Sequence, residues 1–146
     1  MEQDQSKVFM QSAVIPWRRR GEQIELAMIT SVNGRHWVFP KGLIDPGETA
    51  AQSARREAEE EAGLDGEVSA GPVGRYRYDK WGGVCDVEVF LMRVVEERSA
   101  WPEQAMRRRR WFTLDEALGR VEEDDLRAIL RAAVVAVVEG DGGRSA

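Results

Sequence analysis

The chain has few of the residues that build disulfide-rich, zinc-bound or membrane-spanning structures. Its 146 residues include a single cysteine, Cys85, and a single histidine, His36. One thiol excludes a disulfide within the chain and gives no zinc cluster, and the alternating apolar residues around Cys85 predict a buried strand thiol. The longest aliphatic run, Ala132–Val138, is far shorter than the about 20 residues that cross a bilayer. We therefore expect no membrane partner.

The balance of charge is acidic, with a formal net charge of −5 at pH 7. An acidic chain is not expected to bind nucleic acid in general, although a local basic patch stays open. The N-terminus lacks a charged segment followed by an apolar core, so we expect no signal peptide and a cytoplasmic protein. The length suits a single domain over residues 1–146, with a disordered glycine-rich end from Asp141 to Ala146.

Three glutamates, Glu57, Glu60 and Glu61, lie in the second half of a predicted helix. Because each helical residue advances by about 100°, this spacing projects three carboxylates from one side of the helix. Like charges at this spacing are unfavourable by about 0.2–0.5 kcal/mol, and all three crowd the negative end of the helix dipole. A bound cation would explain them, and hard oxygen ligands suit Mg²⁺ or Mn²⁺ completed by substrate phosphates. A glutamate run by itself is most often a solvated helix surface.

The surrounding residues decide between these alternatives. In order, they are Gly42, five residues, Glu48, seven residues, Arg56-Glu57-Ala58, one residue, Glu60-Glu61, one residue and Gly63-Leu64. This pattern resembles the Nudix box at every specified position, and a pattern that fixes so many residues is specific. Local chemistry agrees, because Thr49 and Gln52 form a capping-box pattern and Gly63 suits a left-handed helix end.

The resemblance implies a metal-dependent hydrolase that cuts a diphosphate bond in a nucleoside diphosphate linked to another group, or in a related polyphosphate. It also implies the role of each residue. Glu57 and Glu61 are then the principal metal ligands, Glu60 is a further ligand or the base that takes the proton of water, and Gly42 is a main-chain ligand. Arg56 pairs with Glu48 to fix the loop against the helix.

In some family members the base lies outside the box, which leaves Glu88 and Glu103 as additional candidates. Two alternatives to an enzyme of this kind stay open. One is a catalytically silent module that binds a nucleotide or phosphoinositide, which the intact set of acids argues against. The other is 5′-end processing of RNA, which predicts a wider basic surface than this acidic chain offers.

The segments outside the box indicate a branch of the family. Trp37-Val38-Phe39-Pro40-Lys41-Gly42, with Trp101-Pro102-Glu103 and the basic run into Trp111-Phe112, resembles the branch that handles diphosphoinositol and diadenosine polyphosphates. Lys41, Arg107 and Arg109 are then expected to bind anionic groups, since alternation turns one pair of the four consecutive arginines toward the site. Tyr78 or Tyr76 would stack a purine or pack on the sheet. Many relatives form dimers, so a homodimer is one assembly that the resemblance allows.

Periodicity predicts the secondary structure along the chain. The expected strands are Val8–Trp17, Gln23–Thr30, His36–Phe39, Glu67–Lys80, Gly83–Glu96 and Arg107–Phe112, with Arg18–Gly21 as a turn and Pro40–Gly47 as a loop. Besides the box helix, we expect helices at Leu114–Leu118 and Asp124–Glu139. This order predicts an α+β fold in which a central mixed sheet is covered on both sides, an α/β/α sandwich similar to the Nudix fold.

Overall fold

The structure, a computed structural model, describes residues 7–144 and the side chains of residues 7–140. Its strands are β1 (Val8–Arg20), β2 (Gln23–Thr30), β3 (Trp37–Val38), β4 (Lys41–Leu43), β5 (Leu64–Val68), β6 (Gly74–Lys80), β7 (Gly83–Glu97) and β8 (Arg109–Thr113). Its helices are α1 (Ala50–Glu57), the π-helical turn η1 (Ala58–Ala62), α2 (Leu114–Leu118) and α3 (Asp124–Arg144). No helix within the described part of the chain is both long and apolar enough to cross a membrane.

Two long strands organise the sheet. β1 runs parallel to β7 from Val8↔Val84 to Trp17↔Arg93, and both strands also have antiparallel neighbours. β1 pairs with β2 and β4, while β7 pairs with β5 and β6. One parallel pair among antiparallel pairs makes the sheet mixed, as predicted.

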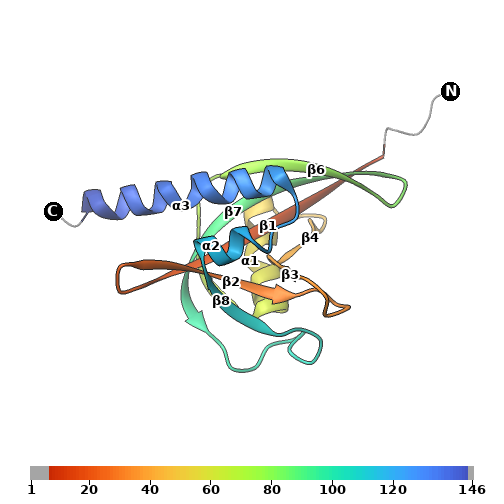
Figure 1. Cartoon of the computed structure of the whole chain (residues 1–146). Helices are drawn as coiled ribbons and strands as arrows, with labels where there is room; N and C mark the ends of the chain where they lie inside the picture. The colour runs from red at the N-terminus through yellow and green to blue at the C-terminus, as the bar shows by residue number, and fades with distance from the viewer. Residues whose placement is uncertain (1–6, 145–146) are drawn as a thin grey trace.

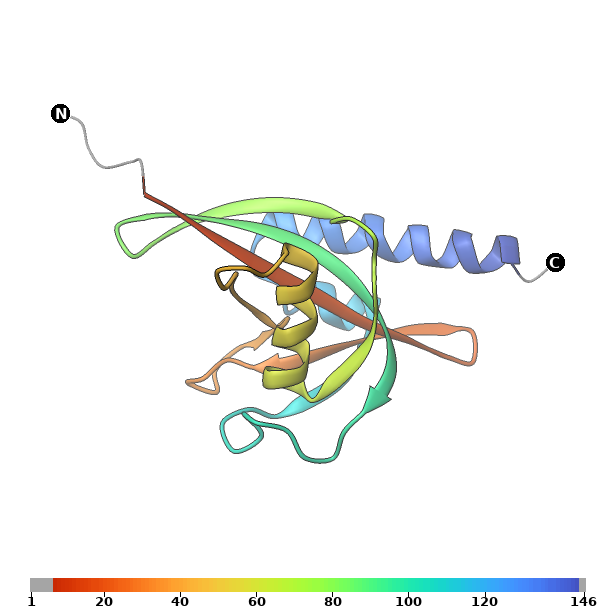
Figure 2. The same cartoon turned by 180° about the vertical axis from the view of Figure 1, so that it is seen from behind.

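Helices cover the sheet on both faces, with α1 on one side and α2 and α3 on the other (Figures 1 and 2). On the α1 side, the small residues Ala54, Ala58 and Ala62 pack against Phe90 and Met92 of β7. On the opposite side, α3 turns an apolar stripe toward the sheet, with Leu126, Leu130, Ala133 and Val134 all buried. The alternating pattern of β7 is confirmed, because Val87 and Val89 belong to the core on the α3 side. The predicted α/β/α sandwich is correct.

Several predicted boundaries are wrong. Arg18, Arg19 and Arg20 belong to β1 rather than to a turn, because they pair with Glu25, Ile24 and Gln23 of β2. The turn lies beyond them, at Gly21, whose positive φ of 63° suits glycine.

The predicted strand Glu67–Lys80 is divided into β5 and β6. Ser69 and Val73 flank the break, and their main-chain N–H groups donate to Leu91 and Val89 of β7. The break contains Pro72, which has no N–H to donate to a ladder. Both pieces pair with β7, but at different positions along it.

Smaller differences affect the remaining elements. The expected loop from Pro40 to Gly47 contains β4, which pairs with β1 through Ser12↔Gly42. β8 begins at Arg109 rather than at Arg107. α3 continues to Arg144, so the predicted helix end at Glu139 is too early; residues 145–146 of the expected disordered end lie outside the described residues.

Candidate active site

The three glutamates lie where the box helix changes its winding. The predicted capping box is present, with Gln52 N–H donating to the Thr49 hydroxyl at 3.1 Å, and Gly63 closes the helix with φ of 66°. Between them, α1 gives way to the π-helical turn η1, a feature that is frequent at functional sites. Glu57 is the last residue of α1, whereas Glu60 and Glu61 belong to η1.

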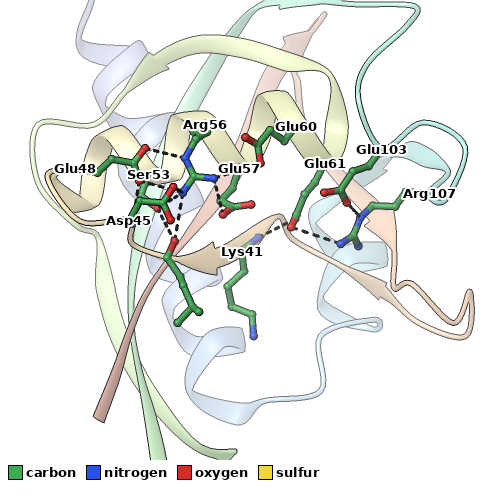
Figure 3. Close-up of polar contacts among 11 residues, drawn as sticks. Lys41, Asp45, Glu48, Ser53, Arg56, Glu57, Glu60, Glu61, Glu103 and Arg107 are labelled. Carbon is green, nitrogen blue, oxygen red and sulfur yellow. Dashed lines mark hydrogen bonds and ion pairs between the residues drawn. The ribbon is translucent and has the colours of Figure 1, made fainter. Parts of the chain in front are cut away.

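The expected single row of carboxylates is therefore wrong in detail. The side chains of Glu57 and Glu61 are 9% and 10% exposed, whereas 41% of the Glu60 side chain is exposed. Glu60 lies against the Arg56 guanidinium at 3.2 Å, apart from the buried pair (Figure 3). The change from α to π winding alters the angular spacing, which a pattern based on 3.6 residues per turn does not anticipate.

Gly42 lies directly against the Glu57 carboxylate. A Cβ atom added at Gly42 would lie 2.1 Å from Glu57 Oε2 and 2.5 Å from its Cδ. Only a residue without a side chain lets β4 approach the carboxylate this closely. The main chain of Gly42 is therefore placed beside Glu57, which is consistent with its predicted role as a main-chain ligand.

Arg56 is the centre of a network that holds the loop before α1. Its Nε and Nη2 donate to the two Glu48 carboxylate oxygens at 2.7 and 3.0 Å, in the predicted ion pair. Nη1 lies 3.2 Å from both Glu57 and Glu60, and Nη2 also contacts the Leu43 carbonyl at 3.3 Å (Figure 3). The hydrogen bond from Arg56 holds the pKa of Glu48 below its usual value. One guanidinium thus links the loop, β4 and two of the predicted metal ligands.

Glu61 is held by contacts from three segments. It accepts a hydrogen bond from the main-chain N–H of Lys41 at 3.1 Å, and Arg107 Nη2 lies 3.5 Å from its other carboxylate oxygen. Arg107 Nε in turn donates to Glu103 at 2.8 Å, so Arg107 links the Glu103 carboxylate to that of Glu61. Trp101 Nε1 donates to the Glu61 carbonyl at 3.0 Å. The structure therefore brings the predicted residues Lys41, Arg107 and Glu103 to the carboxylates.

The electrostatics of the buried pair fit a cation. Burial raises the pKa of Glu61 to about 8, with Glu57 adding to the rise and Arg107 opposing it. Burial also raises the pKa of Glu57, against the opposing effect of Arg56. Two interacting carboxyls in one buried place are costly to ionise together unless positive charge accompanies them. Their donor set, hard oxygen atoms beside a glycine main chain, suits Mg²⁺ or Mn²⁺.

In the conformations shown, no three acidic, histidine or cysteine side chains within residues 7–140 converge on one point as a metal cluster would. Glu60 is held away by Arg56, which leaves Glu57 and Glu61 as the buried pair. Mg²⁺ commonly uses one or two carboxylates together with water and substrate phosphates. The residues present therefore fit such an ion without a complete cage.

Two predicted site residues lie elsewhere. Arg109 donates to the carbonyls of Ala62 and Arg98 at 2.7 and 2.9 Å and stacks on Trp101 at 4.3 Å from the ring centroid. It binds the end of the box helix and lies 3.4 Å from Glu97, so its guanidinium is already occupied, and a role in binding an anionic group stays a prediction. Glu88 lies on the α1 side in register with Ser12, but its carboxylate is paired with Arg75. It does not reach the buried pair, because β1 separates its strand from β4.

Lys41 connects the carboxylates to the other face of the sheet. Its side chain points away from Glu61 (Figure 3) and donates to the Tyr78 hydroxyl at 2.6 Å. Tyr78 in turn donates to Gln11 at 2.8 Å and packs beside Tyr76, so it lies on the sheet. Burial lowers the pKa of Lys41, and Lys80 lowers it further.

A cavity of about 130 Å³ lies on this face, between the sheet and the segment that joins α2 to α3. Met28, Phe39 and Tyr76 give it an apolar floor. Its remaining lining is Ala13, Ser31, His36, Trp37, Val38, Lys41, Arg120, Val121, Glu122, Glu123 and Leu126.

Sequence reasoning missed the cavity residues of the connecting segment. Arg120, Glu122 and Glu123 come from a short polar connection whose composition is ordinary for a turn. His36, which has no partner nearby in sequence, finds one in space, because its Nδ1 lies 3.0 Å from Glu122. The one available signal is Trp37, which belongs to the segment before the box that indicates a branch of the family.

Comparisons with known proteins test the family resemblance. The model of the NUDIX domain matches residues 9–141. Nudix hydrolase 12, mitochondrial, of Arabidopsis thaliana is 38% identical over 104 residues, which are 66% of this chain and 51% of that protein. The chain spans about half the length of the Arabidopsis relatives of this kind. The asymmetrical bis(5′-nucleosyl)-tetraphosphatase of Sus scrofa is 35% identical over 116 residues, which are 74% of this chain and 77% of that enzyme.

The fold also matches solved structures. An Ap4A hydrolase of C. elegans superimposes with a TM-score of 0.69 at 20% identity, over 90% of this chain and 99% of that chain. A binary complex of an Ap4A hydrolase of C. elegans superimposes with a TM-score of 0.68 at 22% identity. The match covers 88% of this chain and 98% of that chain. At these identities the likeness concerns the fold, and it agrees with the predicted α+β architecture.

Proposed function

The chain belongs to the NUDIX family, and we propose that it hydrolyses a diphosphate bond in a nucleoside diphosphate-linked or polyphosphate substrate with the help of Mg²⁺ or Mn²⁺. The observation that carries this proposal is the buried carboxyl pair Glu57 and Glu61, in which Glu57 lies against the main chain of Gly42 and Glu61 accepts from the main chain of Lys41. Burying two acids side by side has no stability rationale, but it suits a site that gathers cations and phosphate oxygens.

Each residue of the site has a proposed task. Glu57, Glu61 and the main chain of Gly42 would hold the ion, which when bound neutralises the diphosphate charge and lowers the pKa of water. Arg56 positions Glu57 and keeps the loop against the helix. The side chain of Glu60 is 41% exposed, compared with 27% for Glu103, so Glu60 is the more accessible acceptor for the proton of the attacking water.

The cavity favours a nucleotide over a diphosphoinositol polyphosphate. Its floor is apolar and aromatic, and Trp37 and Tyr76 offer ring surfaces to a base. Glu122 and Glu123 also line it, and these carboxylates would repel a ring that carries many phosphates. The similarity to the pig tetraphosphatase supports a dinucleoside polyphosphate as the substrate.

A screen for metal-dependent phosphate release tests the proposal. It compares diadenosine polyphosphates, ADP-ribose, other nucleotide conjugates and diphosphoinositol polyphosphates by kcat/KM, with Mg²⁺, with Mn²⁺ and with chelator. We expect the dinucleoside polyphosphates to be preferred and the chelator to abolish turnover.

The variant Glu61→Gln removes one of the two buried carboxylates while nearly keeping the shape of the side chain. We expect it to fold and to lose at least about a hundredfold in kcat, since it lacks a charge that acts on the ion. Glu67→Gln is the matched control, because Glu67 lies on β5 and pairs with Arg93. Undiminished turnover in Glu61→Gln would refute the proposal, as would a wild-type chain that binds these compounds without cleaving any of them.

A further inference from the structure

Ten arginines of the described residues are neutralised by acids. Ion pairs within 4 Å engage Arg18, Arg55, Arg56, Arg75, Arg77, Arg93, Arg98, Arg107, Arg109 and Arg127. Among residues 7–140, Arg108, Arg110 and Arg120 have no carboxylate within ion-pair distance, and they share this with Arg20, Arg35 and Arg131. They differ from those three because each lies over an aromatic ring. In a chain with 26 acids and 21 bases, three unpaired arginines at one place are unexpected. We call these three residues the arginine cluster.

Aromatic rings hold the arginine cluster together. The Arg108 guanidinium carbon lies 5.4 Å from the ring centroid of Trp37, and that of Arg110 lies 5.0 Å from the ring of Phe112. Arg120 approaches Phe112 as well, at 5.8 Å, and the two rings contact each other edge to face at 5.2 Å. A guanidinium that lies over a ring keeps its N–H edges available for an anion.

The arginine cluster arises from two elements that fold together. Arg108 lies directly before β8 and Arg110 is the second residue of that strand, so the two share the face opposite to Arg107 and Arg109. Arg120 follows α2 and lies near Arg110, because both guanidinium groups approach the ring of Phe112. All three side chains belong to exposed residues, which leaves them accessible to a ligand.

The arginine cluster adjoins the cavity. Trp37, Arg120 and Lys41 all line the cavity. Lys41 also donates its main-chain N–H to Glu61, so the cavity begins beside the carboxylates. A substrate whose scissile diphosphate lies at Glu57 and Glu61 and whose body fills the cavity would therefore extend toward the arginine cluster. Arginine forks match the oxygens of a phosphate group.

We propose that Arg108, Arg110 and Arg120 bind a phosphate group of the substrate that is remote from the hydrolysed linkage. The inference rests on the proposed function and narrows its substrate class to diphosphate compounds with a second anionic group across the cavity. Such a group has two chemical sources. It is either the far part of a dinucleoside polyphosphate chain or a phosphate carried on the ribose.

Two matched pairs of substrates distinguish the sources. Diadenosine tetraphosphate and diadenosine diphosphate differ in the length of the phosphate chain, whereas ADP-ribose 2′-phosphate and ADP-ribose differ by one ribose phosphate. The ratio of kcat/KM within each pair is measured for the wild type and for the double variant Arg108→Gln/Arg110→Gln. The control is Arg20→Gln/Arg131→Gln, which removes the same charge from two exposed arginines that do not line the cavity.

We expect the double variant to lower the ratio of one pair by at least about tenfold, the loss typical of a charged hydrogen bond. The pair that responds identifies the source of the phosphate. The control variant is expected to keep both ratios, and thermal unfolding checks that both variants are folded. The proposal is overturned if both kcat/KM ratios of the double variant stay at the wild-type value. It is also overturned if the control variant lowers the same ratio by the same factor.

The arginine cluster is testable even if the wild type hydrolyses none of these compounds and the proposed function fails. Calorimetric binding then compares adenosine 5′-tetraphosphate and adenosine 2′,5′-bisphosphate with adenosine 5′-monophosphate. Preference for one of the two phosphate-rich probes, lost in Arg108→Gln/Arg110→Gln and kept in the control, supports the arginine cluster as a phosphate site. Equal binding of the three probes by the wild type refutes it.

Discussion

The two sides of β4 use charge in opposite ways. On the α1 side, Arg56 and Arg107 are surrounded by carboxylates, and each guanidinium contacts at least two of them. On the cavity side, the arginine cluster lies on aromatic rings and has no acidic partner among the described residues. The first region is balanced within the chain, whereas the second leaves positive charge available to a ligand.

This contrast separates two tasks that the proposed function combines. A carboxylate that acts on a cation must be fixed in place, and the arginines of the α1 side hold Glu57 and Glu61 from both ends. A group that selects a substrate must instead be free until the substrate arrives, because an internal ion pair would compete with it. Lys41 is the link, with its main chain in the first region and its side chain in the second.

The largest effect is expected from Gly42→Ala, which adds one methyl group to the balanced region. The new Cβ would lie 2.1 Å from Glu57 Oε2, so the carboxylate or β4 must move. A displacement of about 1 Å at a catalytic group is enough for roughly a hundredfold loss of kcat. Steady-state kinetics with the preferred substrate measure the loss.

Gly71→Ala is the control for this substitution, because a Cβ atom at Gly71 would have nothing within 4 Å. Its φ does not lie in the left-handed region, so an alanine there is unstrained. If Gly42→Ala and Gly71→Ala have the same kcat, the close approach of β4 to Glu57 is irrelevant to activity.

The pH dependence of the metal-free protein tests whether the buried pair is held at a cost. The pKa of Glu61 is about 8 in the folded chain and about 4.5 when unfolded, so the folded state binds more protons between these values. The free energy of unfolding should therefore decrease as the pH rises from 4.5 to 8. Urea unfolding in chelator measures this slope, which should be shallower in Glu61→Gln. The same slope in the wild type and in Glu61→Gln would show that Glu61 ionises normally.

Local signals predicted the α1 side well. The capping box at Thr49, the left-handed Gly63 and the Glu48–Arg56 pair depend on residues within about twenty positions, and all three are present. The winding of η1 was not predictable, because the same glutamate spacing is compatible with both kinds of helix.

The cavity side was mostly beyond sequence reasoning. Arg108 contacts Trp37 only because β8 and β3 both pair with β2. Arg120 comes from a different element, the segment that follows α2. Alternation did predict that Arg107–Arg110 divide into two pairs, but it could not say which pair is neutralised. Arg109 was chosen because of its charge, whereas the carbonyls that it binds, of Ala62 and Arg98, depend on the packing of the helix end.

The smallest effect, and the finest test of the comparison, is the difference between two neighbouring arginines of α1. Arg56→Lys keeps the charge but loses the fork that binds both oxygens of Glu48, and we expect unfolding to become easier by about 1–3 kcal/mol. Arg55→Lys loses an equally bidentate pair with Asp65, but 59% of the Arg55 side chain is exposed, so about 0–1 kcal/mol is expected. Denaturant unfolding at pH 7 measures both. Equal losses would mean that the network around Arg56 is no more than a surface ion pair, and that the acids of the α1 side are not held more firmly than any others.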